Sequence, residues 1–339
     1  MAWFSANAGT TPEARPAKIT AAEGSNALAR VVVVQDQRAT QTFNPQPAVV
    51  DAMVARGITK LTGLATPAVA WRSLFTTQDV VGIKVYTAPG PTSGTRPAVV
   101  SAVVRSLISA GLKPAQIVIW DKRGEDLRRA GFVTLAETLG VRAAGALESG
   151  YDEKVFYENA VTGKPVWGDL EFGKPEPVGR KSFMTKLVTH ELTKIISIAP
   201  LVNHYEAGVT GHLFSLAMGS MDNTIRFEQE RTLLADPVPE IFGIEALYDR
   251  VVLHITDALL CQYLGENQSL LHYSTVLNQL RFSRDAVALD TLSLQELGRQ
   301  RGRMGMKNST VQFDIYPNAS LMQLGTTNLN HIKVELVTP

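Results

Sequence analysis

The 339-residue sequence contains one cysteine, few aromatic residues and almost no excess of either charge. Cys261 alone excludes an internal disulfide, a cysteine-ligated iron–sulfur cluster and a multi-cysteine zinc site. Lysine and arginine total 33 against 32 aspartates and glutamates, which removes the electrostatic case for a nucleic-acid or anionic-membrane partner. The strongly apolar runs stay below the roughly 18 residues that span a bilayer, so no membrane partner is expected.

The amino-terminal stretch MAWFSANAGTTPEARPAK has neither the charged region nor the long apolar region of a secretory signal. A protein whose export signal had been removed would have the same features. The sequence is therefore compatible with a cytoplasmic location and with a mature periplasmic one.

Strand patterns and helix patterns alternate along the chain. This alternation predicts an α/β fold with mostly parallel sheets flanked by helices. Gly57 is predicted to end the first helix in a left-handed conformation, and Asp285 to cap the last one. Strands are predicted at 29–36, 79–86, 116–121, 194–199, 250–257 and 331–337, and helices at 47–56, 97–110, 125–139 and 286–301.

Between residues 150 and 182 the composition shifts to tyrosine, tryptophan, glycine, proline and lysine. Short alternating segments with turn residues predict β-hairpins there. We therefore expect two α/β lobes, residues 27–149 and 191–339, separated by a β-hairpin insertion at residues 150–190.

Polar residues stand near the predicted carboxyl ends of four strands. Lys84 lies two residues before the end of its strand, Asp121 and Asp257 end theirs, and Asn203 and His204 follow a fourth. Ligands of open parallel sheets bind at this edge. Capping of the following turn explains each residue alone equally well, but four such ends together predict a ligand site.

The loop GPTSGTRP, residues 90–97, lacks the lysine of a P-loop and does not match GxGxxG. Thr95 and Arg96 nevertheless open a predicted helix, a place suited to an anion, and a simple connecting turn is the alternative. Arg226 in MDNTIRFEQE could bind a substrate carboxylate, or it could lie on a solvated loop.

The stretch APLVNHYEAGVTGHLFSLAMGS holds two of the six histidines. Thr210 is predicted to cap a short helix that places His212 in its first turn. The helix dipole disfavours the imidazolium there, so a neutral His212 could accept a proton or bind a metal. His204 precedes it at a spacing that matches no standard zinc motif. A structural, hydrogen-bonded role is the alternative for either histidine.

Asp290 shares one face of the last predicted helix with Val287, Leu294 and Leu297. An unpaired carboxylate buried in such an apolar stripe is strongly unfavourable. Asp290 therefore needs a partner such as Lys84, an arginine, backbone amides or a metal, unless water reaches it at the rim of the sheet.

The family resemblance rests on four stretches. The chain resembles the domain of unknown function 362 family from about Val80 to Leu297, and FSRDAVALDTL resembles its Asp-Pro-Val-Ala-x-Asp signature with Ala286 in place of the proline. The resemblance implies an α/β fold and a shared site at the equivalents of Lys84, His204, Asp285 and Asp290, but no known reaction. The other stretches are VVGIKVYTAPGPTSGTRPAVVSAVVRSLISAGLKPAQIVIWD, ISIAPLVNHYEAGVTGHLFSLAMGS and RVVLHITDAL.

The chain departs from this family at several points. Many relatives carry a lysine where this chain has Asn203, and some carry ferredoxin-like cysteine clusters that Cys261 alone cannot form. Export is frequent among relatives. In layout, the chain is also distantly similar to the nickel-dependent lactate racemase family, whose ligand lies between two α/β lobes.

These observations favour an enzyme that acts on an anionic small molecule. A non-catalytic protein that binds a metal or a small ligand is the alternative, an assembly subunit is a third reading, and a homo-oligomer is compatible with each. In the enzyme hypothesis His204, His212 and Lys84 are catalytic, with a histidine as acid or base. Arg96, Asn203, Thr210 and Arg226 bind substrate, and Asp121, Asp257 and Asp290 orient these groups or hold a divalent metal.

Overall fold

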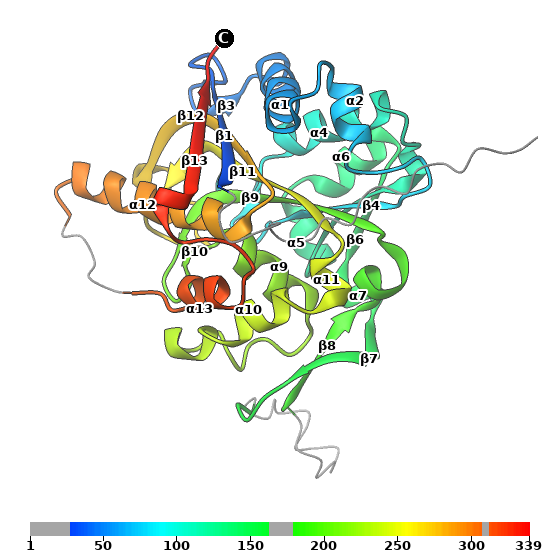
Figure 1. Cartoon of the computed structure of the whole chain (residues 1–339), viewed down its shortest axis with the longest axis vertical. Coiled ribbons are helices and arrows are strands. Elements are labelled where there is room, and N and C mark those ends of the chain that lie inside the picture. Colours follow the sequence, from blue (N-terminus) through cyan, green and yellow to red (C-terminus); the bar gives the residue numbers. More distant parts are fainter. Residues whose placement is uncertain (1–27, 163–178, 307–311) are drawn as a thin grey trace, which may run out of the picture.

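The computed structural model describes residues 28–162, 179–306 and 312–339. Its centre is one mixed sheet in the order β13-β1-β12-β11-β9-β4-β5-β6, with a short β10 paired to β9 (Figure 1). Strand β12 runs antiparallel to both neighbours, whereas the other neighbours along this order pair in parallel. The predicted α/β class is confirmed. The strands are β1 (Ala29–Gln35), β4 (Val81–Val85), β5 (Ile117–Asp121), β6 (Arg142–Gly145), β9 (Lys194–His204), β10 (Gly208–Val209), β11 (Val251–Gln262), β12 (Ser274–Ser283) and β13 (Ile332–Val337).

The sheet passes through both expected lobes. Strand β1 pairs with β12 and β13, and β4 pairs with β9, so strands from 27–149 and 191–339 share one sheet. The division into two lobes, and with it the layout likeness to the lactate racemase family, stays a prediction. The expected antiparallel pair within residues 150–190 is present as β7 (Tyr151–Glu158) and β8 (Lys181–Thr185), a ribbon that projects from the sheet in Figure 1.

The first face of the sheet is apolar. Because side chains alternate along a strand, Ile83, Ile119 and Ile196 point to this face, where they join one large core cluster. Residues of α1 and α4 complete that cluster from above. The helices that contribute to it are α1 (Pro47–Thr62), α2 (Pro67–Arg72), α4 (Pro97–Ser109), α5 (Gly124–Arg129) and α6 (Phe132–Leu139).

The second face combines apolar packing with a polar row. Lys84, Ser197 and His254 stand side by side in register on β4, β9 and β11. Helix α9, every residue of which is buried, lies over this row. The helices of this side are α7 (Ala146–Ser149), α9 (His212–Ser220), α10 (Pro237–Phe242), α11 (Glu245–Tyr248), α12 (Ala286–Arg303) and α13 (Ile315–Leu321).

Short elements connect these layers, and among the described helices none is long and apolar enough for a bilayer crossing. They are β2 (Thr40–Gln41), β3 (Asn44–Pro45), α3 (Gly90–Ser93), 3-10 turns at Pro114–Gln116, Arg231–Leu234, Leu271–Tyr273 and Leu329–His331, and a π turn at Leu187–Glu191.

The predicted end of the first helix at Gly57 is wrong. Helix α1 continues to Thr62, and Gly63, with φ 73°, forms the left-handed end. Gly57 instead lies where α1 crosses β12, because a Cβ atom there would stand 2.2 Å from the ring of Phe282. The glycine allows a close approach of helix and sheet rather than ending the helix.

Two other boundaries differ from the prediction. The helix expected at 125–139 is divided into α5 and α6 by Gly131, which has φ 83°. Strands β9 and β11 run past their predicted ends to His204 and Gln262. His204 is thus the last residue of a strand and is held by the sheet.

Candidate functional site

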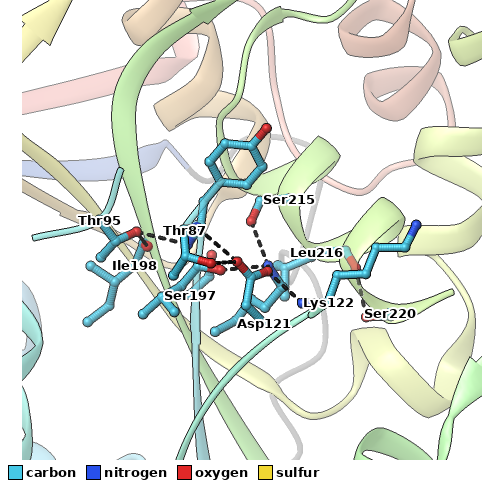
Figure 2. Close-up of polar contacts among 12 residues, drawn as sticks. Thr87, Thr95, Asp121, Lys122, Ser197, Ile198, Ser215, Leu216 and Ser220 are labelled. Carbon is cyan, nitrogen blue, oxygen red and sulfur yellow. Dashed lines mark hydrogen bonds and ion pairs between the residues drawn. The ribbon is translucent and has the colours of Figure 1, made fainter. Parts of the chain in front are cut away.

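Lys84 and Asp121 form a buried ion pair at the ends of β4 and β5. The Lys84 Nζ donates to Asp121 Oδ1 at 2.8 Å, to Ser215 Oγ at 3.0 Å and to the Val85 carbonyl oxygen at 2.7 Å. Burial lowers the pKa of Lys84, while the charge of Asp121 opposes this shift. Asp121 also accepts from the backbone N–H and the hydroxyl of Thr87 (Figure 2). All three donors of Lys84 are engaged, so the pair ties two strands to α9.

Arg96 and Asp257 form a second buried pair, at the start of α4. The Arg96 backbone N–H and Nη1 donate to the two Asp257 carboxylate oxygens at 2.9 and 3.0 Å. Beside them, the Thr95 hydroxyl donates to the Ile198 carbonyl oxygen at 2.7 Å (Figure 2). The sequence predicted an anion at this helix start, and the anion in the structure is Asp257 itself.

Asp290 binds the amino-terminal end of α9. Its carboxylate accepts the backbone N–H groups of His212, at 2.8 and 3.0 Å, and of Leu213, at 2.9 Å. Burial raises the pKa of Asp290 to about 7 against the opposing effect of these N–H groups. Of the partners considered from the sequence, backbone amides are the ones found.

The prediction that Thr210 caps this helix is wrong. The N-cap residue is Gly211, with φ 50°, and a Cβ there would lie 2.5 Å from the Asp290 carboxylate. The Thr210 N–H donates to the Val202 carbonyl oxygen, which holds that residue beside β9. The cap therefore comes from another helix, and sequence spacing alone does not reveal it.

The His212 side chain is buried and hydrogen-bonded at both nitrogens. Its Nδ1 lies 2.9 Å from Ser197 Oγ and its Nε2 lies 3.0 Å from Thr256 Oγ1. The His254 ring is 4.9 Å away, edge to face. Burial lowers the pKa of His212 well below its usual range and that of His254 to about 3.

Arg226 is buried at the base of the β7–β8 ribbon. Its guanidinium donates to Ser182 Oγ at 2.9 Å, to Asn159 Oδ1 at 3.0 Å and to the Val161 carbonyl oxygen at 2.5 Å. Burial lowers the pKa of Arg226. These contacts fasten the ribbon to the loop after α9.

The three aspartates considered for a metal lie in separate contacts. Asp121 pairs with Lys84, Asp257 with Arg96, and Asp290 with the start of α9. Within the part of the chain that the structure describes, no three histidine, cysteine, aspartate or glutamate side chains are placed to hold a metal ion. A metal role for these residues stays a prediction.

His204 differs from the three aspartates and from His212 because one of its nitrogens has no partner among the described residues. Its Nδ1 accepts the backbone N–H groups of Glu206, at 3.3 Å, and Ala207, at 3.1 Å. A neutral imidazole with Nδ1 as acceptor carries its hydrogen on Nε2. Burial lowers the pKa of His204 to about 4, so this neutral form holds at pH 7. The ring packs against Phe214 at 4.3 Å and presents an Nε2–H donor.

Lys122, which the sequence did not identify, is linked to His204 through Glu228. The Lys122 Nζ donates to Thr224 Oγ1, which in turn donates to Glu228 Oε1. Burial lowers the pKa of Lys122, and the charge of Glu228 opposes that shift for Lys122 and for His204 alike. Glu228 therefore acts electrostatically on both. The position of Lys122, directly after an aspartate that ends a strand, was the available signal.

The loop after β11 covers the edge beside His204. The backbone N–H of Glu266 donates to Asn203 Oδ1 at 3.2 Å, and the Tyr86 hydroxyl donates to Asn267 Oδ1 at 2.6 Å. The Asn203 Nδ2 is buried without a partner among the described residues. Burial raises the pKa of Glu266. A pocket of about 320 Å³ opens here, lined by Tyr205, Leu264, Gly265, Glu266, Asn267, Gln268, Leu270 and Tyr273.

One protein family matches the part of the chain in which these residues lie. A family described as a domain of unknown function, DUF362, matches residues 81–295, more than half of the chain. The chain belongs to this family. No curated protein matches the sequence.

One solved structure similar to this DUF362 chain is a crystal structure of a Thermotoga maritima protein from a structural genomics consortium. The two share 11% sequence identity at a TM-score of 0.41, and the match covers 77% of this chain. This chain spans only 60% of the length of the Thermotoga protein.

Both aspartates of the DUF362 signature act as helix caps here. Asp285 accepts the backbone N–H groups of Ala288, at 2.8 Å, and Thr326, at 3.0 Å, while Asp290 binds the start of α9. The predicted cap at Asp285 is confirmed. Burial raises the pKa of Asp285 to about 6. These contacts position α9 and α12, and a direct role of either aspartate in a shared site stays a prediction.

Proposed function

We propose that this chain binds a small molecule with an acidic or carbonyl oxygen at the carboxyl edge of the sheet, where His204 and Lys122 hold that oxygen. The observation that carries the proposal is the orientation of His204. Two backbone N–H groups occupy its Nδ1, which leaves Nε2–H as a fixed donor without a described partner. A preorganised donor of this kind needs no rearrangement to bind an oxyanion.

The choice of Lys122 follows from what the three cations predicted from the sequence do. Lys84 and Arg96 already bind Asp121 and Asp257, and Arg226 is held by the β7–β8 ribbon. The Lys122 Nζ makes one described hydrogen bond, to Thr224, and an ammonium has three donors. We therefore keep the prediction of an anionic ligand, with Lys122 instead of Lys84 as its partner.

An enzyme at this site would use its residues as follows. The His204 Nε2–H stabilises negative charge on the ligand oxygen, in place of the acid or base role expected from the sequence. Lys122 and Glu266 are the groups able to move a proton, because burial lowers the pKa of the lysine and raises that of the glutamate. Both shifts bring the pKa of the group closer to 7, and a group with a pKa near the working pH transfers protons most effectively.

The alternative, a non-catalytic binding protein, is favoured by the covering loop. The Tyr86–Asn267 hydrogen bond and a 3.1 Å contact between Ser93 Oγ and Ser269 Oγ fasten the loop after β11 to the loop after β4. A fastened cover slows ligand release, which serves storage or delivery. A divalent metal that accompanies the ligand is compatible with either function.

Native mass spectrometry and elemental analysis of the purified full chain test for a co-purifying ligand or metal. Binding of carboxylates, phosphates and carbonyl compounds is then measured for the unmodified chain and for His204→Ala, His204→Gln and Lys122→Met. Glutamine can replace the Nε2–H donor and alanine cannot, so His204→Gln should retain the property, turnover or ligand affinity, that His204→Ala loses. His190→Ala, at a histidine with a 62% exposed side chain, is the matched control.

The outcomes separate the candidates. An enzyme loses turnover in His204→Ala while ligand affinity changes by less than about tenfold, whereas a binding protein loses retention. Equal affinity together with equal turnover in all four variants would contradict the proposed site.

A further inference from the structure

Strand β13 ends the sheet with an unpaired outer side. It pairs with β1 on its inner side and is the last strand in the sheet order, so no other described strand pairs with its outer N–H and C=O groups (Figure 1). Its side chains alternate, and Val334 and Leu336 are 49% and 61% exposed on the face that they share with Ile332. An open, partly apolar edge is a ready template for another strand.

The opposite edge of the sheet is different. Strand β6 has four residues, and Arg142 at its start forms an ion pair with Glu191. Such a short edge strand offers few backbone groups for strand addition. Strand β13 has six residues without a proline, and its register with β1 is continuous from Ile332 to Val337, without a bulge. Strand β13 is therefore less protected than β6 against the addition of another strand.

The sequence of β13, Ile332-Lys-Val-Glu-Leu-Val337, is complementary to itself in the antiparallel direction. A two-fold axis through Val334 sets Lys333 opposite Glu335 of a second copy, and Ile332 opposite Leu336, on both sides of the axis. An axis through Glu335 or through Lys333, a slip of two residues, would instead oppose two like charges. The charged residues and the apolar residues of β13 thus favour the same antiparallel register, with the axis through Val334.

We propose that two copies of this chain associate through β13, pairing antiparallel about Val334, so that their sheets become one continuous sheet. The inner neighbours support this arrangement. Val334 and Leu336 stand in register beside Val31 and Val33, which belong to a small core cluster under α12. Pairing extends that cluster across the two-fold axis and buries the exposed side chains of Val334 and Leu336 at its edge. The inference is independent of the ligand site.

Lys333 and Glu335 lie on the other face of the strand. Glu335 already accepts from Arg30 at 2.8 Å and lies 3.4 Å from the Nζ of both Lys60 and Lys333. These cations lower the pKa of Glu335 to about 2, so the carboxylate stays charged across the range in which the dimer is measured. The Lys333 side chain is 60% exposed, and such a surface ion pair is weak enough for Lys333 to exchange Glu335 of its own chain for Glu335 of the second copy.

A cysteine cross-link tests the register. In the full chain, whose one native cysteine is buried, Val334→Cys places two thiols opposite each other, with Cα atoms about 5 Å apart, within disulfide range. Leu336→Cys places them about 13 Å apart along the strands, which is too far. Mild oxidation should therefore produce covalent dimers from Val334→Cys and few from Leu336→Cys, although Leu336 is the more exposed residue.

Sedimentation analysis over a concentration series tests the association itself. The unmodified chain should form dimers, and Val334→Lys, which opposes two lysines at the axis, should weaken dimerisation by about tenfold or more. Val69→Lys, at a valine 42% exposed on α2, is the matched control and should not change it. Thermal unfolding of each variant shows that the fold persists. A monomer at all concentrations, a dimer insensitive to Val334→Lys, or equal cross-linking of the two cysteine variants would overturn the proposal.

Discussion

The two faces of the central sheet are stabilised by different interactions. On the first face, isoleucines and valines of β4, β5 and β9 pack against α1 and α4 in one apolar cluster. On the second, Lys84, Ser197 and His254 form a polar row under α9. The first face depends on shape and apolar area, and many similar side chains could serve there. The second depends on particular pairs, because a buried polar group without its partner is costly.

The largest difference between the faces, measured as loss in the free energy of unfolding, is expected for variants that affect Lys84 and its neighbour Ile83. Asp121→Ala leaves the buried Lys84 ammonium without its carboxylate, which should lower the free energy of unfolding by about 3–5 kcal/mol. Ile83→Val, one residue away on the apolar face, should cost only about 1 kcal/mol. Urea unfolding measures both. Combining Asp121→Ala with Lys84→Met should recover part of the loss, and equal losses for the two single variants would remove the distinction between the faces.

Asp290 gives the next largest effect. Asp290→Asn replaces one of the two oxygens that receive the N–H groups of α9 by an NH2 group, so we expect a loss of about 2–3 kcal/mol at pH 8, where the carboxylate is ionised. Asp51→Asn, at an exposed aspartate of α1, is the control and should change stability little.

The pH dependence of Asp290 follows from its raised pKa. The folded carboxyl titrates at about 7 and the unfolded one near 3.8, so the folded state binds the extra proton between these values. Its contribution to stability is complete below pH 3.8 and is lost as the pH rises through 7. Asp290→Asn should therefore flatten the stability profile between pH 4 and 7. A profile between pH 4 and 7 that Asp290→Asn leaves unchanged would mean that the N–H groups of α9 keep Asp290 ionised in the folded state.

Much of the first face could be predicted from the sequence, and little of the second. The apolar patterns of β4 and β5 identified strands within two residues of their observed limits, because alternation and burial are local properties. The pairing of Lys84 with Asp121 is a property of neighbouring strands, so the sequence indicated the two residues and not their contact. Strand β12 had no predicted counterpart, since its polar residues interrupt the apolar run.

The candidate site illustrates the same limit. His204 was identified from its place after a strand, but its donor tautomer depends on the turn formed by Glu206 and Ala207. Lys122 was overlooked because lysines after strands are common, and only the fold shows that this one is half-buried beside Thr224 and Glu228. Local periodicity predicts where a chain is buried, and long-range contacts decide what a buried polar group does.

Gly57 tests whether the apolar face is as tolerant as its composition indicates. A Cβ at Gly57 would meet the Phe282 ring at 2.2 Å, so Gly57→Ala should lower the free energy of unfolding by about 1–2 kcal/mol despite the higher helix propensity of alanine. Gly298→Ala is the control, because no atom lies within 4 Å of its Cβ position in α12, and it should stabilise by about 1 kcal/mol. Thermal unfolding compares the two, and stabilisation by both would show that α1 can move away from β12.

The smallest effect at neutral pH, and the clearest in its pH dependence, is expected at His254. This side chain is 3% exposed, and its Nδ1 has no partner among the described residues, so His254→Leu should change stability at pH 7 by less than about 1 kcal/mol. The folded pKa of about 3 lies below the ordinary histidine value of 6.5, so the unfolded state takes up a proton first as the pH falls. Stability from neutral His254 is therefore complete above pH 6.5 and is lost towards pH 3.

In His254→Leu this acid-side loss should be smaller than in the unmodified chain, by up to about 1.4 kcal/mol for each pH unit below 6.5. Leu253→Ile, the neighbouring residue on the apolar face, should leave the slope unchanged and is the matched control. Urea unfolding at pH 7, 6, 5 and 4 measures both slopes. If the stability–pH profiles of His254→Leu and of the unmodified chain are parallel, water or a proton donor reaches His254. The second face would then be more accessible to solvent than the first.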